Sequence, residues 1–188
     1  MLKEEINQAA QALKEGKVLL YPTDTVWGLG CDVNNEEAIQ RILTLKQSPA
    51  NKSMIILVAD TELLHQYVHK IPDLAWDLIE YAEKPLTIIY PQGKNVTPGL
   101  LAEDGSLAIR VVKDSFCRDF LRKAGRGIVS TSANLSGQKA PDIFDAIDHK
   151  IVEGADYVVG YGHQMKSQFP PSTIIKIGYD GEFKFIRK

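Results

Sequence analysis

Residues 130–137, STSANLSG, gather small hydroxyl and amide side chains with no bulky group between them. They follow the apolar pair Ile128 and Val129, which is typical of the end of a buried strand. Short donors and acceptors in that place either form an elaborate turn or hold a polar ligand. From the residues alone, both interpretations stay open.

Four other polar segments lie at or near predicted strands. They are YPTDTVWGLG (21–30), LKQSPANKSM (45–54), SLAIRVV (106–112) and PPSTIIK (170–176). The first three also have a purely structural explanation: a tight turn, a lysine on the carbonyl end of a helix, and an edge charge that discourages aggregation, respectively. Together with residues 130–137, these segments offer small hydroxyls and cations, which suit a nucleotide and a zwitterion. They offer no residue suited to covalent catalysis. The residues concerned are Thr23, Lys46, Arg110, Ser132 to Asn134, and Ser172.

Several common chemistries are set aside because their motifs are absent from the sequence. There is no G-x-x-x-x-G-K-[ST] phosphate loop, no G-x-G-x-x-G, no H-E-x-x-H and no G-x-S-x-G nucleophile elbow. Cys31 and Cys117 are far apart and predict two buried thiols. His65 and His69 would share a helix face, but without a third ligand they indicate surface histidines rather than a metal site.

The composition is that of an ordinary globular protein. Of the 188 residues, 44% are hydrophobic and 24% are charged, with a formal net charge of -2. No apolar run approaches the roughly 20 residues that cross a bilayer, and the amino-terminal residues are too charged for a signal peptide. We therefore expect a cytoplasmic protein with no membrane partner. The best basic patch, Lys113 to Arg126, predicts a solvated helix face, with RNA binding as the alternative.

Apolar periodicity predicts that helices and strands alternate. Helices are expected at 3–15, from 34–37 to about 46, at 61–68, 72–82 and 115–124, and around 144–148. Strands are expected at 18–22, 53–58, 86–90, 106–112, 127–132, 156–159, 172–177 and 183–188. This order favours an α/β fold in a single domain, residues 1–188, with an open, twisted mixed sheet flanked by helices. The sheet is expected to be partly parallel, with hairpin-like pairing toward the end, and to carry a polar and cationic cleft.

Taken in order, the polar segments resemble the YrdC family. YPTDTVWGLG is similar to its opening motif, LAIRV to its central arginine strand, STSANLSG to its Ser-x-Asn motif and PSTII to its late Ser-Thr strand. The resemblance covers nearly the whole chain and implies the short, single-domain YrdC-like form. It also implies a nucleotidyltransferase, a threonylcarbamoyl-AMP synthase that combines L-threonine, bicarbonate and ATP and releases pyrophosphate.

The same resemblance implies partners and residue roles. The product would feed tRNA modification, so tRNA or double-stranded RNA and the proteins that transfer threonylcarbamoyl to tRNA are implied partners, with Mg²⁺ accompanying ATP. Lys46 and Arg110 are the implied catalytic residues, which stabilise charge and do not act as nucleophiles. No magnesium ligand is assigned, and Asp24 is a candidate by location alone. The implied threonine-binding residues are Thr23, Arg110, Ser130 and Ser172, and the implied ATP-binding residues are Lys46, Lys52, Ser106, Ser132, Asn134 and Arg187.

One position departs from the family pattern. The family usually has Lys-x-Arg where this chain has Lys46-Gln47-Ser48, and a serine replaces neither the charge nor the bidentate geometry of an arginine. Lys52, in the same loop, is expected to compensate in part. Two alternatives to the synthase stay open: an RNA-binding protein that uses Lys113 to Arg126, and an ATP-using relative with another substrate.

Overall fold

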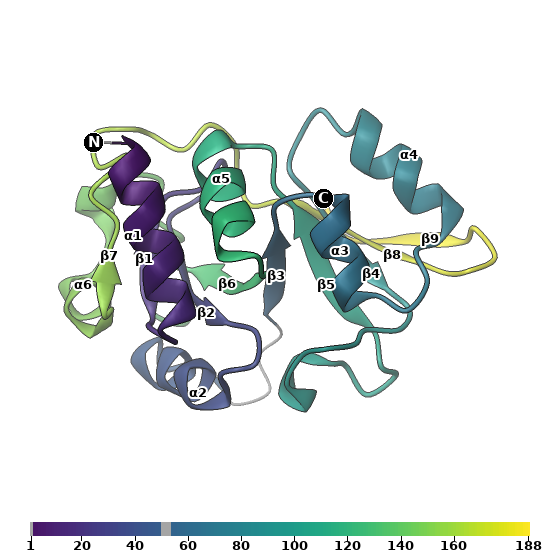
Figure 1. Cartoon of the computed structure of the whole chain (residues 1–188), viewed down its shortest axis with the longest axis horizontal. Coiled ribbons are helices and arrows are strands. Elements are labelled where there is room, and N and C mark those ends of the chain that lie inside the picture. Colours follow the sequence, from purple (N-terminus) through teal and green to yellow (C-terminus); the bar gives the residue numbers. More distant parts are fainter. Residues whose placement is uncertain (1, 50–53) are drawn as a thin grey trace.

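The computed structural model describes residues 2–49 and 54–188. Helices and strands alternate along the chain, as the sequence predicts (Figure 1). The α-helices are α1 (Leu2–Lys14), α2 (Glu36–Leu45), α3 (Thr61–Tyr67), α4 (Asp73–Tyr81), α5 (Ser115–Ala124) and α6 (His149–Gly154), and two 3-10 helices are η1 (Pro98–Leu100) and η2 (Phe144–Ala146). The strands are β1 (Leu19–Tyr21), β2 (Gly28–Asp32), β3 (Ile55–Val58), β4 (Leu86–Tyr90), β5 (Leu107–Val111), β6 (Ile128–Ser132), β7 (Tyr157–Val158), β8 (Thr173–Ile177) and β9 (Phe183–Arg187).

The strands form one mixed sheet. Over the described ranges its order is β7-β1-β2-β6-β3-β5-β4-β8-β9. The pairs β1–β7, β3–β5 and β4–β8 are parallel, and the other neighbouring pairs are antiparallel, including the hairpin β8–β9. The predicted mixed α/β sheet, with partly parallel connections and a hairpin toward its end, is therefore confirmed.

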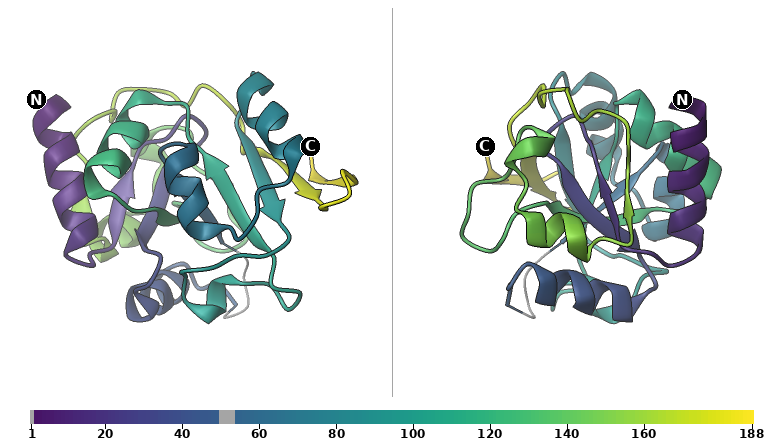
Figure 2. Two further views of the ribbon diagram at one scale, coloured as in Figure 1. Left: turned by 45° about the vertical axis from the view of Figure 1, so that its right-hand side comes forward. Right: turned by 90° about the vertical axis from the view of Figure 1, so that its left-hand side faces the viewer.

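Helices flank the sheet and supply the apolar stripes that cover it. In Figure 1, α1, α5 and α3 lie side by side, while α2 and α6 lie together at another part of the molecule. The right-hand view of Figure 2 places α1 on one side of the strands and α6 on the other. Helix α5 buries Phe116, Phe120 and Leu121 against the core. No helix in the described ranges combines the length and apolarity that a bilayer crossing requires.

Helix α5 has well-defined ends. Asp114 is its N-cap, since the side chain accepts a 2.8 Å hydrogen bond from the Cys117 amide, and Gly125 ends it with a left-handed φ of 69°.

Cys117 lies within this helix and Cys31 within β2, and both thiols are buried and free, as predicted. Burial raises the pKa of each thiol.

Two elements differ from the sequence prediction. Residues Gly28 to Asp32 form strand β2, not a loop, and β2 lies between β1 and β6. A Cβ atom on Gly30 would lie 2.2 Å from the carbonyl oxygen of Val129, so the glycine permits a close backbone approach, and neither Gly28 nor Gly30 has a positive φ. Near residue 144 the chain makes only η2, and the true helix there is α6.

Candidate functional site

A cavity of about 430 Å³ opens where several predicted polar segments meet. Its walls include the turn after β1, the middle of β5, the end of β6 and both ends of the β8–β9 hairpin. Ala108 and Arg110 face it, whereas Ile109 and Val111 line a small hollow beneath α4, so the cavity lies on the sheet face opposite α4. The predicted site residues that line it are Thr23, Arg110, Ser130, Ser132, Ser172 and Arg187.

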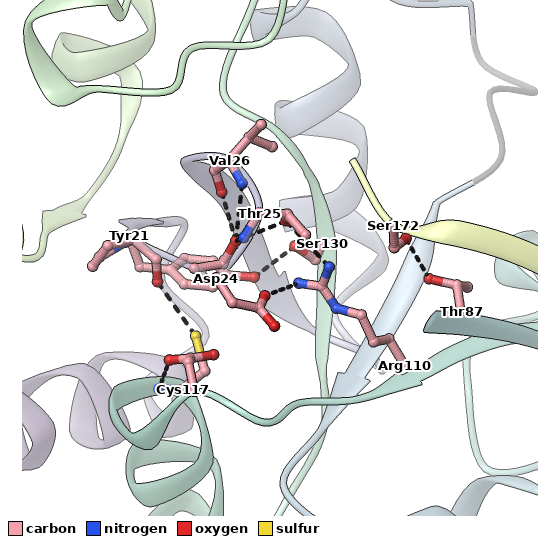
Figure 3. A network of polar contacts seen from close by, with 12 residues as sticks. Tyr21, Asp24, Thr25, Val26, Thr87, Arg110, Cys117, Ser130 and Ser172 are labelled. Atoms are coloured by element: carbon pink, nitrogen blue, oxygen red, sulfur yellow. Dashed lines mark hydrogen bonds and ion pairs between the residues drawn. The ribbon is translucent and has the colours of Figure 1, made fainter. Parts of the chain in front are cut away.

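Arg110 is the most constrained cation in this cavity. Its residue is 3% exposed, Nη1 donates a 3.1 Å hydrogen bond to Thr25 Oγ1, and Nη2 lies 3.3 Å from Asp24 Oδ1. Nε is buried and has no hydrogen-bond partner among the described residues. Figure 3 shows the guanidinium between the Asp24–Thr25 turn and the Thr87–Ser172 pair. A buried cation that lines a cavity and retains an unpaired donor is suited to binding an anion.

The turn after β1 is built around one hydroxyl. Thr23 Oγ1 donates to the carbonyl of Val26 at 2.7 Å and accepts hydrogen bonds from the amides of Thr25 and Val26. The segment is therefore a turn that also forms part of the cavity wall. Asp24 does not line the cavity and instead forms an ion pair with Arg110.

A second arginine borders the same cavity. Arg187 Nε and Nη2 donate to the carbonyl oxygen of Ser172 at 3.0 and 2.7 Å, and Ser172 Oγ lies 2.8 Å from Thr87 Oγ1. Burial lowers the pKa of Arg187, and the charge of Arg110 lowers it further. Because two cations disfavour each other here, an anion between them would relieve the repulsion.

Ser130 receives a hydrogen bond that the sequence analysis did not predict. The Tyr21 hydroxyl donates to Ser130 Oγ at 2.7 Å, and the tyrosine is fully buried (Figure 3). No local sequence signal indicates this bond, because it depends on the register that places Tyr21 opposite Gly28 of the next strand.

Three predicted ligands do not line the cavity. Lys46 is 0% exposed, and its Nζ donates to the carbonyl oxygens of Ser132 and Asn134, the latter at 2.5 Å. Its own carbonyl accepts a 2.8 Å hydrogen bond from the amide of Ser136. The Lys46 side chain thus fastens the loop that follows β6.

The other two also have structural contacts. Asn134 Nδ2 donates to the carbonyls of Leu135 and Gln138 at 2.8 and 2.9 Å, which makes it a turn residue. Ser106 is buried beside Asp104, whose carboxylate accepts its amide hydrogen bond at 3.0 Å. Lys52 lies outside the described residues. Nucleotide contacts by Lys46, Lys52, Ser106 and Asn134 stay predictions.

The departure from Lys-x-Arg leaves an unpaired hydroxyl. Ser48 Oγ is buried and has no hydrogen-bond partner within residues 2–49 and 54–188. Gln47, just before it, adopts a left-handed φ of 53° at the end of α2.

No ready metal site borders the cavity. Its described lining contains no carboxylate, and no group of three His, Cys, Asp or Glu side chains comes together in the part of the chain that the structure describes. Asp24, the candidate by location, is paired with Arg110.

The predicted basic patch is largely neutralised. Arg122 pairs with Asp60 at 2.7 Å, Arg126 with Asp32 at 2.5 Å, and Arg118 with its neighbour Asp119 at 3.2 Å. Arg126 also follows the end of α5, so the patch from Lys113 to Arg126 does not form one helical face. These contacts agree with a solvated surface and give RNA binding there no support.

Comparison with known proteins finds a family and relatives that match most of this chain. The model of the Sua5/YciO/YrdC family, described as "Telomere recombination", matches residues 11–188. A threonylcarbamoyl-AMP synthase of Pseudoalteromonas translucida is 38% identical over 172 residues, which are 90% of this chain and 91% of that protein. One of Idiomarina loihiensis is 35% identical over 154 residues, 80% and 82% of the two chains.

Solved structures share the fold. P. abyssi Sua5 complexed with L-threonine superposes with a TM-score of 0.77 at 28% identity, over 92% of this chain and 50% of that one, so this chain spans about half of it. E. coli YciO superposes with a TM-score of 0.83 at 24% identity, over 100% of this chain and 90% of that one.

Proposed function

Because this chain belongs to the Sua5/YciO/YrdC family, we propose that it is a threonylcarbamoyl-AMP synthase. Its substrates on this proposal are L-threonine, bicarbonate and ATP, and its products are threonylcarbamoyl-AMP, pyrophosphate and water. The proposal is supported by relatives named for this activity and by a structural relative complexed with L-threonine. The product would serve tRNA modification, with tRNA and group-transfer proteins as downstream partners.

One observation carries the proposal to this chain's own residues: the buried guanidinium of Arg110, with an unpaired Nε, lines a cavity that Arg187 also borders. The reaction joins a carbamate to a triphosphate, and two anions of this kind repel each other. Two arginines offset that repulsion and stabilise the charge that develops on the phosphate oxygens. The hydroxyls of Thr23, Ser130 and Ser172 are suited to the polar groups of an amino acid.

The chemistry needs no protein nucleophile. The threonine amine captures bicarbonate to give a carbamate and water, and a carbamate oxygen then attacks the α-phosphate of ATP. The bond to the β-phosphate breaks, and pyrophosphate leaves with its electron pair. The contribution of this chain is to hold the two reactants in line within one cavity and to neutralise charge through Arg110 and Arg187.

Magnesium would arrive with the nucleotide. The described cavity wall offers hydroxyls but no carboxylate, so the phosphate oxygens and water would supply most of its ligands. When bound, the ion supplies further neutralisation of phosphate charge.

Pyrophosphate release tests the proposal. The purified protein is incubated with ATP, bicarbonate and Mg²⁺, with and without L-threonine, and with L-serine or L-valine instead. We expect release that depends on L-threonine. Release driven better by another amino acid would identify a different substrate, and absence of release from the folded protein would overturn the synthase.

A further inference from the structure

Tyr21 and Ser130 are joined across an intervening strand. Tyr21 belongs to β1 and Ser130 to β6, while β2 lies between these two strands in the sheet. The 2.7 Å hydrogen bond from the phenol to Ser130 Oγ therefore spans the width of β2. Tyr21 is 0% exposed and packs edge-on against Phe120, with ring centroids 5.7 Å apart. The hydrogen bond to Ser130 and the contact with Phe120 thus both fix the position of the Tyr21 ring.

Gly28 leaves the space for this contact. It is the residue of β2 that pairs with Tyr21 in register. A Cβ atom at this position would lie 3.1 Å from Tyr21 Cζ and 3.3 Å from Ser130 Oγ. A side chain here would therefore crowd both partners of the hydrogen bond. The glycine of the opening segment thus has a specific steric purpose.

The direction of this bond decides what Ser130 offers to the cavity. A serine hydroxyl has one proton to donate and lone pairs to accept. Since Tyr21 donates to Oγ, the Ser130 proton is left for another acceptor, and Ser130 lines the cavity. The ionised carboxylate of an amino acid is an acceptor only, whereas its ammonium group is a donor only. A serine held in this way favours the carboxylate.

We infer that Tyr21 is a positioning residue that fixes Ser130 as a hydrogen-bond donor to the carboxylate of the amino-acid substrate. The inference rests on the proposed function, which places L-threonine in this cavity. Tyr21 acts only through Ser130, because it is fully buried and does not line the cavity.

A double-mutant cycle on L-threonine binding tests the inference. Titration calorimetry is carried out on the unaltered protein, Tyr21→Phe, Ser130→Ala and the double variant. Tyr21→Phe is expected to weaken binding roughly three- to tenfold, about the effect of one neutral hydrogen bond. In the Ser130→Ala background the same change is expected to have almost no effect, because the group that Tyr21 orients is gone. Tyr90→Phe, a change at another buried tyrosine outside the cavity wall, is the matched control and is expected to leave affinity unchanged.

Other outcomes are distinguishable. Equal threonine affinity in Tyr21→Phe and the unaltered protein overturns the inference, as does an equal loss with and without Ser130. If Tyr21→Phe fails to fold, Gly28→Ala provides the test, since its Cβ crowds the same contact and should weaken binding only while Ser130 is present. Absence of threonine binding by the unaltered protein overturns the proposed function and, with it, this inference.

Discussion

Asp24 and Arg110 form a buried ion pair, with Asp24 Oδ1 3.3 Å from Arg110 Nη2 and side chains that are 8% and 4% exposed. Asp24 thereby fixes Arg110 without taking part in the cavity wall. Desolvating two charges is costly, and removing one partner leaves the other uncompensated. The position of Arg110 therefore depends on Asp24.

Asp24→Asn is expected to destabilise the protein by about 3 kcal/mol, because the buried guanidinium loses its counter-ion. Urea denaturation monitored by fluorescence measures the change. Asp104→Asn is the matched control: Asp104 pairs with Lys176 at 2.5 Å, but the two side chains are 54% and 41% exposed. That surface pair should contribute at most about 1 kcal/mol. Equal losses in the two variants would show that Asp24 does not balance Arg110.

Arg110→Lys is expected to lower kcat/KM for pyrophosphate release at least 100-fold. Lysine keeps the charge, but its single nitrogen cannot take the places of Nη1 at Thr25, Nη2 at Asp24 and the unpaired Nε. Initial rates at several ATP and threonine concentrations provide the measurement. Arg118→Lys, on the exposed pair with Asp119, is expected to leave the rates unchanged. Activity within twofold of the unaltered protein would remove Arg110 from the reaction.

Lys46→Met is expected to cost roughly 2 to 3 kcal/mol of stability, because the carbonyls of Ser132 and Asn134 lose a charged donor. Loss of pyrophosphate release should accompany it, through displacement of Ser132 at the end of β6 and of the loop that follows. Chemical denaturation and ATP affinity are measured together, with the exposed Lys123→Met as the control. Unchanged stability with a large loss of ATP affinity would favour a phosphate ligand over a loop fastener.

Asp114→Asn is expected to stabilise the protein at pH 7. Burial raises the pKa of Asp114, and the charge of Asp24 adds to this, so the folded state disfavours the ionised form. That cost is absent below the ordinary pKa of the carboxyl group and grows as pH rises through the raised value. Asparagine keeps the N-cap of α5 without a charge.

Denaturation of both proteins between pH 4 and pH 7.5 checks this prediction. The advantage of the Asp114→Asn variant should shrink toward pH 4. A variant that is less stable than the unaltered protein at pH 7 would contradict it.

Local chemistry explains how much of the fold could be predicted. Asn35 was expected to open α2, and its side chain does accept from the amide of Ala38 at 3.0 Å. Strand β2 was missed because its glycines read as a turn; their real purpose depends on Tyr21 and Val129, which belong to neighbouring strands. The order of strands in the sheet depends on such long-range contacts, which periodicity does not encode.

The sequence indicates which residues belong to the candidate site better than it indicates where their side chains point. Small hydroxyls at strand ends and an arginine within a strand drew attention to segments whose residues Thr23, Ser130 and Arg110 all line one cavity. Their roles in binding stay predictions. The direction of a long side chain is not encoded locally, and Lys46 turns toward carbonyl groups of its own chain. Its site role and that of Asn134 therefore stay predictions.

The bond between Tyr21 and Ser130 also bears on how the site forms during folding. Its partners are 109 residues apart in sequence, and β2 must already lie between β1 and β6 for the bond to exist. Closing so large a loop has an entropic cost that only extensive sheet formation can repay. We therefore expect threonine affinity to appear only at the end of refolding, in step with the slowest return of native fluorescence.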